Sequence, residues 1–164
     1  MRVLHDVFTN DEMVSDAYTP WEYTFDNLIL EVPSKYIVKG HQDYGIESEE
    51  ALEEVGGERV LNLVDAFNLT QTNFDKKSYT TYIKGYMMKL KKHLEENNPE
   101  RVKPFMESAQ GFVKAMMDKF AEYEFWMSSS CDAEAMIILS YWKAEDAEGP
   151  VFVYFNDGVI EKKY

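Results

Sequence analysis

The side chains best suited to catalysis or metal binding are three histidines and one cysteine. His5, His41 and His93 lie far apart, and none has a second His or a Cys at the spacing of a zinc site. Cys131 has no cationic neighbour in sequence to favour its thiolate, which indicates a buried or bystander thiol, although folding can still bring a histidine to it. The eight glycines form neither common phosphate-binding motif. These residues give no reason to expect an enzyme.

Carboxylates are far more numerous, and some of them are candidates for protein contacts or weak calcium binding. Asp11 and Glu12 lie in a polar turn near the N-terminus. Residues 40–58 form an acidic stretch that is either a solvated loop or a segment that captures a divalent cation, although it lacks the ligand pattern of an EF-hand. Asp132 and Glu134 are a further candidate for weak Ca²⁺ binding. No cofactor is required on this interpretation.

The charge distribution separates one basic region from an acidic remainder. The net charge of −13 argues against general nucleic-acid binding. Residues 74–120, however, hold 10 Lys and Arg against 6 Asp and Glu. Within them Lys77, Lys84 and Lys91 recur every seven residues and form one row on a helix. The row is either a solvated helix face or a docking row for an acidic partner surface.

Residues 75–120 predict two amphipathic helices joined by a turn, and this hairpin is the element that positions the lysine row. Asp75 is a plausible N-cap, and apolar residues follow it at three- and four-residue steps. A turn at 99–103 with regular helix after it fits Pro99 and Pro104. The apolar stripes are Tyr79, Tyr82, Ile83, Tyr86, Met87, Leu90 and Leu94, then Val102, Phe105, Met106, Ala109, Phe112, Val113, Met116, Met117 and Phe120.

The segments on both sides of the hairpin predict strands, so the fold class is α+β, mainly β. Asp157-Gly158 predicts a tight hairpin into residues 159–163, and residues 35–38 are expected to pair with the strand at 28–32. Residues 1–164 are expected to form one domain without a membrane span or signal peptide, and to be monomeric. The expected strands are 2–8, 28–32, 35–38, 60–69, 123–127, 136–143, 151–155 and 159–163.

Four separated motifs resemble the translationally controlled tumour protein (TCTP) family, from the first residues to the last. They occur in the family's order, and the helical turn matches it nearly letter for letter. The motifs are Asp6 with Asp11-Glu12 and Ser15-Asp16, the stretch 82–87 (YIKGYM), the stretch 94–106 (LEENNPERVKPFM), and Asp157-Gly158 with Glu161-Lys162.

The resemblance implies a tent-like body of curved β-sheets, related to small-GTPase exchange-factor and chaperone proteins, with the hairpin projecting from it. It implies a non-enzymatic cytoplasmic protein linked to growth control, small-GTPase binding, microtubule association, calcium binding and anti-apoptotic contacts with Bcl-family proteins, with non-classical secretion as a family property. Tubulin would be contacted through the lysine row.

The resemblance also assigns contact residues for the small GTPase Rheb. The glutamate of the Asp-Glu pair is Glu12 here, beside Asp11. A second family glutamate falls on Ser129, so that acid is missing, and the family's I-G-G-N-x-S signature is absent apart from Gly56-Gly57. Two functions follow. The first is binding of a Rheb-type GTPase as a growth regulator or chaperone of its nucleotide-free form. The alternative is a microtubule- and calcium-binding scaffold or anti-apoptotic chaperone that uses the basic helical hairpin, without exchange activity.

Overall fold

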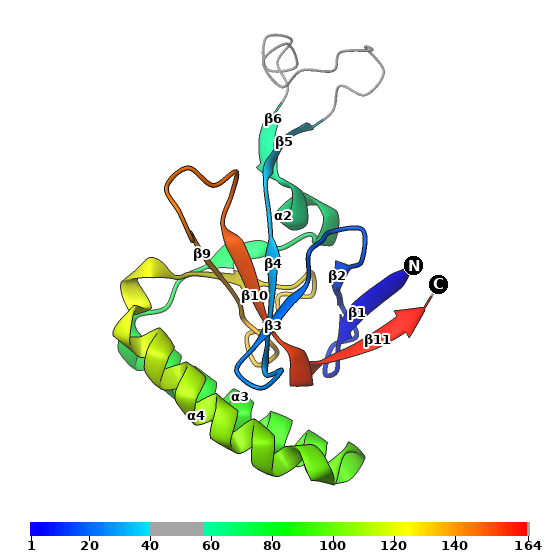
Figure 1. Cartoon of the computed structure of the whole chain (residues 1–164), viewed down its shortest axis with the longest axis vertical. Helices are drawn as coiled ribbons and strands as arrows, with labels where there is room; N and C mark the ends of the chain where they lie inside the picture. Colours follow the sequence, from blue (N-terminus) through cyan, green and yellow to red (C-terminus); the bar gives the residue numbers. More distant parts are fainter. Residues whose placement is uncertain (40–57, 164) are drawn as a thin grey trace.

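A computed structural model describes residues 1–39 and 58–163, in which strands form three antiparallel sheets and an inserted helical hairpin lies at one end of them (Figure 1). The first sheet has the order β11-β1-β2, the second β3-β4-β10-β9-β8-β7, and the third β5-β6. The strands are β1 (Arg2–Asp6), β2 (Glu12–Ser15), β3 (Glu22–Thr24), β4 (Ile29–Pro33), β5 (Tyr36–Lys39), β6 (Glu58–Leu61), β7 (Thr70–Thr72), β8 (Glu124–Met127), β9 (Ile138–Tyr141), β10 (Val151–Phe155) and β11 (Val159–Lys163).

The predicted hairpin is confirmed as α3 (Lys76–Asn97) and α4 (Val102–Asp118), which lie side by side across one end of the sheets (Figure 1). Asp75 caps α3, because its carboxylate accepts the Ser78 N–H at 2.7 Å while the Ser78 hydroxyl accepts the Asp75 N–H. One 3₁₀ turn, η2 (Pro99–Arg101), separates the helices. Pro104 falls in the first turn of α4, where its missing N–H leaves no helical bond unmade.

Aromatic side chains join the hairpin to the six-stranded sheet. Tyr86 and Phe112 each lie within 6 Å of Phe155 between ring centroids, and all three are buried. Tyr82 binds the backbone just before β9, because its hydroxyl donates to the Ala135 carbonyl at 2.6 Å and accepts the Ile137 N–H at 2.8 Å. Of the apolar stripes read from the sequence, the aromatic residues Tyr82, Tyr86 and Phe112 therefore pack the hairpin on the body.

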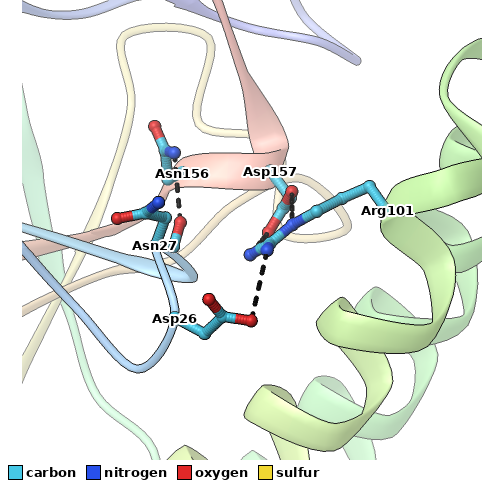
Figure 2. A network of polar contacts seen from close by, with 5 residues as sticks. All are labelled: Asp26, Asn27, Arg101, Asn156 and Asp157. Carbon is cyan, nitrogen blue, oxygen red and sulfur yellow. Dashed lines mark hydrogen bonds and ion pairs between the residues drawn. The ribbon is translucent and has the colours of Figure 1, made fainter.

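An ion pair fixes the turn of the hairpin to the body (Figure 2). Arg101 donates to Asp157 through Nε at 2.8 Å and through Nη2 at 3.0 Å, and Asp26 lies 3.8 Å from Nη1. Asp157 belongs to the single 3₁₀ turn η4 (Asn156–Gly158) between β10 and β11. Two of the four family motifs thus meet in one bidentate contact, which gives them a structural role.

The predicted strand over residues 60–69 is wrong beyond its start. Only β6 (Glu58–Leu61) is extended, and α2 (Asn62–Phe67) follows it. Leu63 and Phe67 are four residues apart and both buried, so they share one helical face. Asn68 then ends the helix in the left-handed conformation at φ 54°.

The predicted hairpin at Asp157-Gly158 is also wrong, because β10 and β11 belong to different sheets. β10 pairs with β4 and β9, whereas β11 pairs with β1. The Val7 N–H donates to the Gly158 carbonyl at 3.0 Å, so the turn is bound to the neighbouring sheet. A Cβ on Gly158 would lie 2.7 Å from Met136 Cε, which explains why glycine fits this crowded turn.

Two further pairings differ from the sequence interpretation. Residues 35–38 were expected to pair with β4, but β5 pairs with β6. The Ser34 N–H donates to the Pro150 carbonyl at 3.1 Å, which extends the pairing of β4 with β10 by one residue, and β5 begins two residues later. The short strand β2 lacks a sequence pattern long enough to be recognised, because it has only four residues. The acidic stretch 40–57 lies outside the described residues.

Candidate functional site

The turn between β1 and β2 positions the predicted GTPase-contact residues. Asp6 is buried at the start of this turn, and its carboxylate accepts the Phe8 N–H at 2.8 Å and the Met136 N–H at 3.3 Å. Burial raises the pKa of Asp6. The Asp6 N–H donates to the Asp11 carbonyl at 2.9 Å, and Asn10 adopts a positive φ of 65°. The turn therefore has a fixed shape that determines where Asp11 and Glu12 lie.

Asp11 connects this turn to a distant one. Its Oδ2 accepts hydrogen bonds from the Ser128 hydroxyl at 2.7 Å, the Ser130 hydroxyl at 2.6 Å and the Ser130 N–H at 3.0 Å. Burial acts to raise the pKa of Asp11, but the hydrogen bonds from Ser130 and Ser128 outweigh it and lower this pKa overall. Asp11 is thus bonded within the chain instead of being an open contact residue.

Glu12, Ser129 and Ser130 are exposed in the same region, which we name the corner: Asp11, Glu12 and Ser128–Ser130. Ser129 lies between the two serines that bind Asp11, and Glu12 directly follows Asp11. The structure therefore brings together the three residues predicted for GTPase contact, although they are 117 positions apart in sequence. The role of Ser128 and Ser130 was missed, because no sequence pattern links them to Asp11.

Cys131 follows the corner and is exposed, so of the two alternatives, a buried or a bystander thiol, burial does not apply. It has a positive φ of 54°, and its sulfur lies 3.6 Å from the Thr70 hydroxyl. Ser128 also accepts the Cys131 N–H through its carbonyl at 2.9 Å, which closes the turn. No catalytic partner of the thiol is apparent in the part of the chain that the structure describes.

The predicted calcium residues Asp132 and Glu134 form a local turn. Asp132 Oδ1 accepts the Glu134 N–H at 2.9 Å, and Lys89 Nζ donates to the Glu134 carbonyl at 3.0 Å. Within residues 1–39 and 58–163, no group of three or more His, Cys, Asp or Glu side chains could hold a metal ion. Calcium binding by these residues stays a prediction.

The predicted lysine row lies on α3. Lys77 and Lys84 are exposed and Lys91 is half-buried. None of them forms an ion pair with another described residue. Lys84 also borders a groove between α3 and α4, and Lys114 of α4 borders it too. No helix in the described ranges is long and apolar enough to cross a membrane.

The fold and these surfaces define a β-sheet scaffold with an attached helical hairpin. The sequence pattern of the family described as "Translationally controlled tumour protein" matches residues 1–160, and the chain belongs to this family. A curated relative from Plasmodium chabaudi chabaudi, a "Translationally-controlled tumor protein homolog", is 44% identical over all of both chains.

Solved structures agree with this assignment. The "Translationally Controlled Tumor-associated Protein p23fyp" from Schizosaccharomyces pombe has a TM-score of 0.80 at 40% identity and covers all of both chains. The translationally-controlled tumor protein from Caenorhabditis elegans has a TM-score of 0.73 at 25% identity, covering 100% of this chain and 99% of that one. The α+β fold expected from the resemblance is thereby confirmed.

Proposed function

We propose that the chain binds a Ras-like small GTPase of the Rheb type through the corner, as a growth regulator or a chaperone of the nucleotide-free form. The observation that carries this proposal is the bonding of Asp11 to the residues on both sides of Ser129. It gives Glu12 and Ser129 a common, fixed backbone while leaving both side chains exposed. Preorganisation of this kind lowers the entropy cost of binding.

Glu12 supplies the negative charge of this contact. A carboxylate inserted near the nucleotide site of a GTPase competes for the Mg²⁺ ion or for the basic residue that holds the phosphates. Ser129 adds no second charge, since it stands where the family resemblance implies an acid. We therefore expect binding that accelerates nucleotide release only weakly.

Two measurements with a Rheb-type GTPase test this function: the affinity of the chain for the GTPase, and the rate at which the GTPase releases a fluorescent guanine nucleotide. The Glu12→Gln variant is expected to lose binding by about tenfold, as for a central charged contact. The control variant Glu100→Gln removes an exposed carboxylate from the turn of the hairpin, far along the chain from the corner, and should bind like the wild type. Ser129→Glu should strengthen binding and speed release. Equal affinities for all four proteins would rule out the corner as the contact.

A second candidate function is a scaffold that binds an acidic partner, such as the acidic tails of tubulin, through the lysine row. It is favoured by one observation: two of these lysines are exposed, and the described residues offer the row no ion-pair partner. Such an association falls steeply as salt rises.

Co-sedimentation with microtubules across a salt series tests the second candidate. Reversal of Lys77, Lys84 and Lys91 to Glu should abolish pelleting at low salt. A control variant that reverses Lys35, Lys119 and Lys163 to Glu changes the net charge by the same amount and should still pellet with microtubules. Pelleting of the row variant at the wild-type level would reject this function.

A further inference from the structure

The groove between α3 and α4 is an apolar surface to which none of the three sheets contributes a lining residue. All of its lining residues belong to the two helices, and its volume is 580 Å³, which is the size of a ligand-binding site. Ile83 and Ala109 are buried beneath it. Its sides are Met87, Met88, Met106 and Val113.

Methionine chemistry makes this surface suited to another protein segment. Met88 is 66% exposed, an unusual position for a large apolar side chain with apolar neighbours. Methionine is unbranched and polarizable, so it adapts to the shape of a partner side chain. A groove between two antiparallel helices accepts a third helix, whose apolar residues at three- and four-residue steps enter the groove.

The charges at the edges select the partner. Lys84 comes from α3 and Lys114 from α4, Gln110 is the remaining polar lining residue, and no carboxylate lines the groove. Residues 74–120 carry an excess of four positive charges in a chain of net charge −13. A symmetric pairing of two such hairpins would bring like charges together, which disfavours a second copy of the chain as the occupant.

We propose that this methionine groove binds an amphipathic helix of a partner protein that carries acidic residues on both sides of its apolar face. The groove is separate from the corner, so this inference goes beyond GTPase binding. It also differs from the docking of acidic tails on the lysine row, because it requires apolar side chains in the partner and a helical pattern.

A labelled synthetic helix tests the proposal. The probe is a peptide of about 16 residues with Leu at positions i, i+4 and i+7 and Glu on both flanks. Its control has the same composition with the leucines moved off one face. Fluorescence anisotropy with the full chain should give an affinity at least about tenfold higher for the patterned peptide. Equal binding of both peptides, or no binding at about 1 mM, would overturn the proposal.

Matched variants locate the contact. Met88→Gln should weaken binding about tenfold, whereas Ile160→Gln, which changes a 53% exposed residue on β11, should leave it unchanged. Lys84→Gln with Lys114→Gln should reduce binding and its salt dependence. GTPase binding should be the same in Met88→Gln as in the wild type, which separates a failure here from a failure at the corner.

Methyl NMR of the methionines provides the direct readout. The patterned peptide should shift the signals of Met87, Met88 and Met106 and leave those of the buried Met13 and Met136 unchanged. Shifts confined to methionines outside the groove would contradict the proposal. Concentration-dependent self-association without peptide, abolished by Met88→Gln, would instead identify a second copy as the occupant and also overturn it.

Discussion

Asp11 and Glu12 are adjacent in sequence, yet their carboxylates have different environments. Asp11 accepts three hydrogen bonds from Ser128 and Ser130, whereas Glu12 is exposed at the start of β2. One carboxylate therefore stabilises the corner, and the neighbouring one is available to a partner. A change at either residue would weaken GTPase binding, but only Asp11 should also change the stability of the fold.

The acid sensitivity of the corner follows from Asp11. The pKa of Asp11 is lower in the folded chain than in the unfolded chain. Its ionised carboxylate therefore stabilises the fold fully above the unfolded pKa of 3.8, and this stabilisation is lost as the pH falls through the lower folded pKa. Urea unfolding between about pH 2 and pH 5 should show a shallower decline in stability for Asp11→Asn than for the wild type. An identical pH dependence would mean that these hydrogen bonds do not favour the ionised form.

Among the elements, the hairpin combines strong helical periodicity with two glycines in its helices. Gly111 in α4 and Gly85 in α3 have open space where a Cβ would lie. Gly111→Ala should raise the free energy of unfolding by about 0.5–1 kcal/mol, because it reduces the entropy of the unfolded chain without a clash. Gly158→Ala is the opposite case, since its Cβ would collide with Tyr86 and Met136. Chemical denaturation measures both, and a destabilised Gly111→Ala would refute the first expectation.

The link between the hairpin and the sheets depends on Arg101 and Asp157. Their side chains are 17% and 8% exposed, so removal of one partner leaves the other with a charge that is largely shielded from water. Asp157→Asn should lower the free energy of unfolding by about 2 kcal/mol. Glu161→Gln removes the exposed ion pair with Arg2 and should lower the free energy of unfolding by less than Asp157→Asn does. Comparable losses in both variants, measured by denaturant unfolding, would show that the Arg101 contact is an ordinary surface pair.

The helical hairpin could be predicted from the sequence, whereas the short helix α2 and the partners of the strands could not. The hairpin is encoded by local sequence: apolar residues at helical spacing, Asp75 as the N-cap, and the two prolines at the turn. Strand pairing depends on residues far apart, such as β1 with β11. Short segments like α2, with six residues, offer too few positions to distinguish a helix from a strand. The corner was predictable only through the family resemblance, since the bonds of Asp11 cross from one sheet to another.

At the scale of the whole molecule, the corner and the methionine groove lie on different elements of one acidic chain. The corner belongs to the turns next to β2 and β8, and the groove belongs to α3 and α4. The aromatic packing of Tyr86 and Phe112 on Phe155 holds the hairpin to the sheets. This arrangement allows two partners of different chemistry to bind the same chain at separate surfaces.

Backbone NMR of the labelled chain, titrated with a nucleotide-free Rheb-type GTPase, tests the role of the corner most directly. We expect the amide signals of residues 8–15 and 127–132 to shift or broaden first, and those of the residues lining the groove to stay unchanged. The Glu12→Gln variant should lose these changes, while the spectrum of the free variant stays that of a folded protein. Changes confined to α3 and α4, or no changes at all, would contradict the assignment of the corner as the GTPase contact.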